Sequence, residues 1–87
     1  MRFAIQGCPG AVLLEVPRDV GLGFFEWLGL GRPEFGAVTS RELAPLCRRR
    51  LWPLPRNDHP TFQPLAASML AIAEAAMATG DAHVVFG

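Results

Sequence analysis

The chain has 87 residues, 51% of them hydrophobic and 18% charged, and its formal net charge at pH 7 is +0. This apolar content excludes an intrinsically disordered chain, and this length supports one small hydrophobic core, so we expect residues 1–87 to form a single domain. All eight basic residues are Arg. The absence of Lys excludes a Schiff-base lysine and the lysine of a phosphate-binding P-loop. The abundant Ala, Gly and Pro are typical of GC-rich coding in a prokaryote, a phage or another mobile element.

The beginning of the chain does not resemble a signal peptide, because a glutamine, a glycine and a proline interrupt its apolar run at residues 6–9. The Ala-rich stretch at 65–78 is shorter than the roughly 20 apolar residues that cross a bilayer. We therefore expect a cytoplasmic protein without a membrane partner, in which Cys8 and Cys47 stay reduced.

Two strands are predicted first, at 2–6 and 11–16. Apolar and polar side chains alternate at 2–6, and the segment at 11–16 is read as a second strand of the same kind. The intervening GCPG favours a turn, so the pair is predicted to form a β-hairpin. A helix follows, with Asp19 as its N-cap and with Gly29 and Gly31 at its end. Its apolar stripe consists of Val20, Phe24, Trp27 and Leu28.

The sequence VTSREL predicts the start of a second helix. Thr39 is placed to cap it, Glu42 to return the hydrogen bond in a capping box, and Val38 to pack against Leu43 as a hydrophobic staple. Pro45 removes one intrahelical hydrogen bond, so we expect a kink or a short first turn there.

Three prolines favour extended geometry at 52–60, which is predicted to be a polyproline-like connector. Thr61 is expected to cap the longest helix and Gly80 to follow its C-cap. A final strand, HVVFG, is expected to join the hairpin, because an isolated hairpin is barely stable in water. The sequence thus predicts a two-layer α+β domain of order ββαααβ, in which two or three helices pack on a small antiparallel or mixed sheet.

The long helix has two distinct faces. Its core-facing stripe is predicted to contain Phe62, Leu65, Met69, Ile72, Ala73 and Ala76. The opposite face contains Gln63, Ala67, Ala71, Glu74, Ala75 and Ala78. Its small side chains would let another helix approach, so Ala67, Ala71 and Ala78 are candidates for a homodimer contact. Alanine is also the best helix former, and an exposed Ala face needs no partner to explain it.

Metal and catalytic chemistry find little support in the spacing of the reactive residues. Cys8, Cys47, His59 and His83 could in number form a Cys2His2 zinc site, but no two of them are close in sequence. A thiolate pair of Cys47 with His59 or His83 finds equally little support in the local sequence. We expect Cys47 to be a small core residue, and the chain to hold no metal or cofactor and not to be an enzyme.

The neutral net charge conceals a basic segment. Residues 41–56 carry five Arg and one Glu, or +4, whereas residues 57–87 carry −3. Such a patch suits an acidic protein surface, nucleic acid, or simply the solvated end of a helix. Arg and Trp are enriched where binding energy concentrates. The predicted partner-binding residues are therefore Arg41, Arg48, Arg49, Trp52 and Arg56.

These observations favour a small non-enzymatic protein-binding module, acting as an inhibitor, adaptor or assembly factor on a larger protein or nucleoprotein complex. Binding of nucleic acid by the basic patch at Arg41–Arg56 is the first alternative, and a zinc- or thiol-dependent protein is the second. Residues 35–43, FGAVTSREL, look like the helix-start segment of some small phage tail-assembly chaperones. We carry no function over from this nine-residue resemblance.

Overall fold

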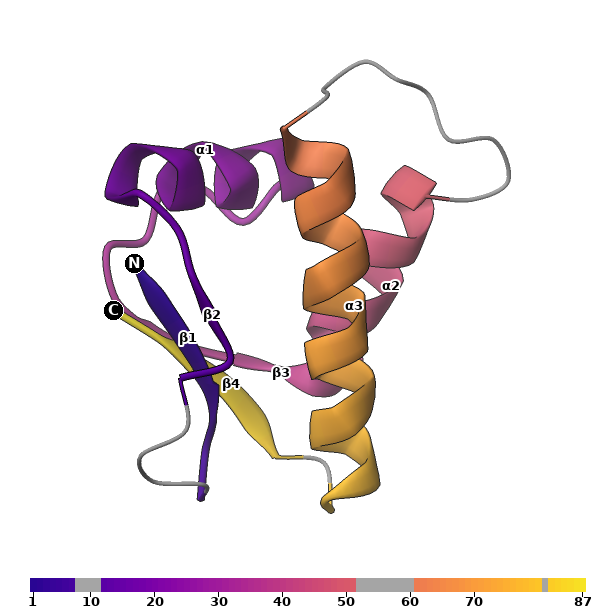
Figure 1. The fold of residues 1–87 in the computed structure, drawn as a ribbon. Helices are drawn as coiled ribbons and strands as arrows, with labels where there is room; N and C mark the ends of the chain where they lie inside the picture. Colours follow the sequence, from indigo (N-terminus) through magenta and orange to yellow (C-terminus); the bar gives the residue numbers. More distant parts are fainter. Residues whose placement is uncertain (8–11, 52–60, 81) are drawn as a thin grey trace.

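A four-stranded antiparallel sheet, in the order β2-β1-β4-β3, forms one layer of the structure (Figure 1). The structure is a computed structural model, and it describes residues 1–7, 12–51, 61–80 and 82–87. The strands are β1 (Arg2–Ile5), β2 (Leu14–Glu15), β3 (Gly36–Thr39) and β4 (His83–Phe86). The predicted two-layer α+β fold is confirmed, with the hairpin joined by the last strand.

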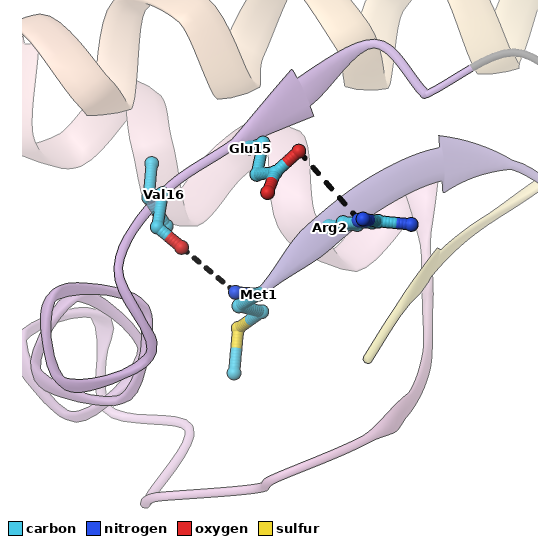
Figure 2. Close-up of polar contacts among 4 residues, drawn as sticks. All are labelled: Met1, Arg2, Glu15 and Val16. Carbon is cyan, nitrogen blue, oxygen red and sulfur yellow. Dashed lines mark hydrogen bonds and ion pairs between the residues drawn. The ribbon is translucent and has the colours of Figure 1, made fainter.

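The hairpin is held mainly by its backbone. The Met1 nitrogen donates a hydrogen bond to the Val16 carbonyl at 2.7 Å (Figure 2). The Val16 N–H returns one to the Met1 carbonyl at 3.0 Å. The side chains of Arg2 and Glu15 lie across the two strands with 3.6 Å between Nε and Oε2. Both are largely exposed, so this ion pair adds little stability. The predicted GCPG turn lies outside the described residues.

The strand β3 was not predicted, and it changes the element order to ββαβααβ. Its sequence, GAVT, runs directly into the helix cap and is too short to show a clear alternation. It forms because it pairs with the side of β4 that does not bond to β1. The pairing runs from Gly36 opposite Phe86 to Thr39 opposite His83. Non-local pairing of this kind leaves no local signal in the sequence.

Helix α1 (Arg18–Leu28) begins two residues earlier than predicted. Its N-cap is Pro17, with no side-chain cap hydrogen bond among the described residues, so the prediction of Asp19 as the cap is wrong. Asp19 instead lies in the first turn, where a carboxylate interacts favourably with the helix dipole. The helix ends as predicted at Gly29, whose φ of 90° favours glycine.

The predicted apolar stripe of α1 faces the core. Phe24 and Leu28 are buried, whereas Val20 and Trp27 are half-buried. Phe25 is also buried, beside the stripe. The helix therefore contributes two consecutive phenylalanines to the core.

Helix α2 (Ser40–Leu51) confirms the predicted start. The Glu42 N–H donates to Oγ1 of Thr39 at 3.2 Å, and the two staple residues, Val38 and Leu43, are both buried. The helix runs continuously through Pro45, which is exposed, so the expected short first turn is not formed. The predicted connector at 52–60 lies outside the described residues.

Helix α3 (Phe62–Ala78) packs along α2, and α1 lies across one end of the pair (Figure 1). Thr61 stands at the N-cap position of α3 as predicted, but its backbone is helical and its side chain makes no cap hydrogen bond with described residues. Gly80, with φ of 87°, follows the C-cap as predicted. None of the helices in the described ranges is long and apolar enough to span a membrane.

The core-facing stripe predicted for α3 is confirmed, since all its members are buried except half-buried Phe62. Gln63, predicted to lie on the opposite face, is buried instead, and its Nε2 has no hydrogen-bond partner within the described parts of the chain. A helix position at the margin of the apolar stripe is buried only if a neighbouring element covers it. The sequence of one helix does not show whether such an element is present.

Aromatic side chains join the two layers. Phe25 of α1 lies 4.5 Å from Phe86 of β4 and 5.8 Å from Phe3 of β1, measured between ring centroids. Phe24 lies 6.0 Å from both Trp27 and Phe62. One set of rings thus attaches α1 to the sheet, and the other attaches it to α3.

The two candidate capping threonines provide a direct test of the helix starts. Thr39→Ala should lower the free energy of unfolding by about 1 kcal/mol, because it removes a cap hydrogen bond. Thr61→Ala is the matched control and should change it by less than about 0.5 kcal/mol. Urea unfolding followed by circular dichroism measures both. Equal losses would contradict the assignment of the caps.

Candidate functional site

Helix α2 places three of the five predicted binding residues on the surface. Arg41, Arg48 and Arg49 are exposed, and Arg41 and Arg48 are seven residues apart, which puts them on one helix face. Trp52 and Arg56 lie outside the described residues. The structure therefore describes only the helical part of the predicted basic patch.

Two of the adjacent arginines interact with neighbouring helices. The Nη2 atom of Arg48 lies 3.6 Å from Oε1 of Glu74 on α3, and both side chains are 53% exposed. The guanidinium of Arg50 lies 5.0 Å from the centroid of the Trp27 ring and donates to the Trp27 carbonyl at 2.5 Å. The sequence did not assign a role to Arg50. Part of the basic run thus connects α2 to α3 and α1.

Cys47 is confirmed as a core residue, because its side chain is fully buried on the core-facing side of α2. Burial removes the thiolate from water and raises the pKa of Cys47 from 9.0 to about 12. The thiol is therefore protonated at neutral pH and unsuited to nucleophilic attack.

Of the other residues considered as zinc ligands, the structure describes only His83. His83 is exposed on β4, whereas Cys8 and His59 lie outside the described residues. No three His, Cys, Asp or Glu side chains gather in a metal-binding group within residues 1–7, 12–51, 61–80 and 82–87. The geometry offers no support for the zinc alternative.

The Ala face of α3 is exposed where predicted. Ala67, Ala71 and Ala78 all lie on the surface, with Glu74 between them. Because Glu74 pairs with Arg48, the centre of this face carries charge rather than a continuous apolar stripe. The homodimer contact remains a prediction.

The most exposed large apolar side chain described is Phe35, which the sequence analysis did not select. It is 78% exposed and directly precedes β3, the strand at one edge of the sheet. A single aromatic residue between Glu34 and Gly36 has no periodic apolar neighbours, so its sequence context does not distinguish a core residue from a surface one.

Two hollows flank Phe35. One, of about 280 Å³, is lined by Met1, Arg18, Glu34 and Gly87 together with Phe35. The other, of about 250 Å³, lies beside β3. Both volumes fall below the ~300 to 1,000 Å³ of typical small-molecule sites, and they suit single side chains of a partner better than a cofactor.

Polar groups surround this apolar centre. Arg18 and Glu34 form an ion pair of 2.6 Å beside one hollow, and Glu42 lines the other. An exposed aromatic side chain with hollows beside it and charged residues at its margin is the arrangement found in protein-binding surfaces. We define Phe35, the two hollows and β3 as the β3 surface.

The comparisons with known proteins match no family model, no curated protein and no solved structure.

The role of Arg50 can be separated from that of its neighbour Arg49, which makes no hydrogen bond or ion pair with the described residues. Arg50→Ala should lower the free energy of unfolding by about 1 kcal/mol, because it removes the contact with the Trp27 ring and carbonyl. Arg49→Ala should change it by less than about 0.5 kcal/mol. Chemical unfolding monitored by Trp fluorescence checks both values. A larger loss in Arg49→Ala than in Arg50→Ala would contradict the assignment.

The raised pKa of Cys47 predicts a dependence of stability on alkaline pH. In the unfolded chain the thiol ionises near its ordinary pKa of 9.0, whereas in the folded protein it stays protonated up to about 12. The folded state therefore holds more protons above pH 9, and the free energy of unfolding should fall by up to about 1.4 kcal/mol per pH unit.

This slope is open to measurement because the sequence contains no Lys or Tyr that would titrate in the same range. Urea unfolding from pH 8 to about pH 11, in a Cys8→Ser background, should show the decline. The additional variant Cys47→Ala should be less stable at pH 8 but should lack the decline. An equal slope in both proteins would show that Cys47 is not its cause.

Proposed function

We propose that the chain is a small protein-binding module that acts by association rather than by catalysis, on a larger protein or nucleoprotein complex. The supporting observation is Phe35, 78% exposed between two hollows at the edge of the sheet. Full burial of a phenylalanine side chain stabilises a complex by about 1.5 to 3 kcal/mol. A partner that covers the β3 surface would gain this contribution.

In this proposal the arginines of α2 are secondary contacts. Arg48 and Arg50 already interact with Glu74 and Trp27, so a partner would compete with these intramolecular contacts. The five residues proposed from the sequence, Arg41, Arg48, Arg49, Trp52 and Arg56, would then lie at the periphery of the contact. Roles as an inhibitor, adaptor or assembly factor in the cytoplasm of a prokaryote, or on behalf of a phage, are the more specific forms of the proposal.

The β3 surface is tested by Phe35→Asp, compared with Val12→Asp as a control. Val12 is also an exposed apolar residue, at 51%, but it leads into β2 at the opposite edge of the sheet. Immobilised wild-type protein and Val12→Asp should retain a protein from a lysate of the source cells, and Phe35→Asp should lose it, because a carboxylate replaces the apolar anchor.

The capture is repeated after nuclease treatment, and the melting temperature of each variant is measured. Retention by Phe35→Asp at wild-type level would contradict the proposed surface. Loss of the captured protein after nuclease treatment would favour the nucleic-acid alternative instead.

A further inference from the structure

The direction of the backbone groups of β3 follows from the hydrogen bonds of its neighbours. The N–H groups of Arg2 in β1 and of Gln6, the residue after β1, donate to the carbonyls of Gly87 and His83, both at 2.8 Å. In an antiparallel strand, alternate residues bond to opposite sides. Val84 and Phe86 therefore bond toward β3.

On β3, the residues paired with these two are Val38 and Gly36. The residue between them, Ala37, consequently directs its N–H and C=O away from the sheet. Ala37 and Gly36 are both exposed, and β3 is the last strand of the sheet, so no described strand pairs with this edge. The backbone of β3 can accept a further strand.

The two edges of the sheet differ in their protection. At the β2 edge, Val16 bonds to Met1, so Glu15 directs its backbone outward and also carries a charged side chain paired with Arg2. Charged side chains on an edge strand discourage pairing with other chains. The sequence GAVT of β3 contains no charge, so its edge lacks this protection.

A hollow of about 250 Å³ opens beside this edge. Its walls are apolar side chains from both layers and from the loop before β3, and Glu42, exposed in the first turn of α2, is its charged lining residue. The apolar walls include Phe25, Leu30, Pro33 and Phe86. A ligand bound along β3 would meet an apolar hollow and a carboxylate.

We propose that β3 binds an extended segment of a partner protein, which adds to the sheet as a fifth strand. This inference rests on the proposed function and specifies its partner class. The segment forms backbone hydrogen bonds with Ala37, places an apolar side chain in the hollow and presents a basic side chain to Glu42. Side chains of an added strand alternate between the two faces of the sheet. The residues of the segment that the β3 surface recognises should therefore lie at every second position.

A second copy of the chain fits this edge less well. Two β3 strands paired about Ala37 would present GAVT to GAVT, which supplies no basic side chain for Glu42. The valine of that sequence, Val38, is buried in its own core. The occupant inferred here is therefore a segment of another protein.

The test begins with selection of linear peptides from a displayed random library on the immobilised wild-type protein. Enriched peptides should share an apolar residue and a basic residue at a fixed spacing. Selection on Glu42→Gln should lose the preference for the basic residue. Failure to enrich any peptide, or enrichment without the shared apolar residue, would overturn the proposal.

Proline substitutions then test the backbone pairing with one synthesised enriched peptide. Ala37→Pro removes the outward N–H at an edge position where proline is tolerated, and it should raise the Kd by about tenfold or more. Glu15→Pro makes the same change at the other edge and should leave the Kd within about twofold of the wild-type value. Fluorescence anisotropy measures both affinities, and equal Kd values for wild type and Ala37→Pro would overturn the proposal.

N-methylation of successive peptide nitrogens provides a readout on the wild-type protein, in case Ala37→Pro fails to fold. Methylation should weaken binding at alternate positions only, since only alternate N–H groups face β3. A flat profile would overturn strand addition. Sedimentation equilibrium of the protein alone would overturn the inferred occupant if it revealed a dimer that Ala37→Pro abolishes.

These outcomes separate the inference from the proposed function. If capture of a protein by the whole chain depends on Phe35 but peptide binding shows no strand-like pattern, strand addition is wrong and the β3 surface stands. If capture does not depend on Phe35, the proposed function itself fails.

Discussion

The insertion of β4 between β1 and β3 is the constraint on which the rest of the structure depends. This strand, near the end of the described chain, pairs with both neighbours and directs Val84 and Phe86 to the face that the helices cover. Phe86 then meets Phe25 of α1 at a ring distance of 4.5 Å, which joins the two layers. Without β4, the hairpin and β3 would have no common partner.

The same insertion determines which surface is available for binding. Because β4 occupies the inner side of β3, the outer side of β3 becomes an edge of the sheet. The chain then enters α2 through the cap formed by Thr39, which places Glu42 beside that edge. A backbone edge, an apolar hollow and a carboxylate are thus brought together by one strand and one helix start.

Two arginines of the basic run in α2 contact the neighbouring helices. Arg48 reaches Glu74 on α3, and Arg50 reaches Trp27 on α1. Cys47 lies on the opposite, buried side of the same helix, where desolvation keeps its thiol protonated. Helix α2 thus contacts α3 and α1 through Arg48 and Arg50 and contributes Cys47 to the core.

The sequence by itself determined the features whose causes are local. The alternation at 2–6, the cap at Thr39, the glycine ends of α1 and α3 and the core stripe of α3 all depend on residues within a few positions of one another, and the structure confirms each of them. Asp19 was wrongly predicted as a cap because capping residue types also occur within first turns, whereas Thr61 stands at the N-cap position of α3 but makes no side-chain cap hydrogen bond with described residues.

Only the tertiary structure decided the features that depend on pairing between distant segments. The strand β3 exists because β4 lies beside it, Gln63 is buried because neighbouring elements cover the margin of α3, and Phe35 is exposed because it precedes an edge strand. The β3 surface, proposed as the main binding surface in place of the predicted arginines, also depends on pairing between distant segments. Hydrogen bonds across a sheet join residues that are far apart in the chain, and so do the contacts that bury a helix face. No single short stretch of sequence therefore determines which strands pair or which helix positions are buried.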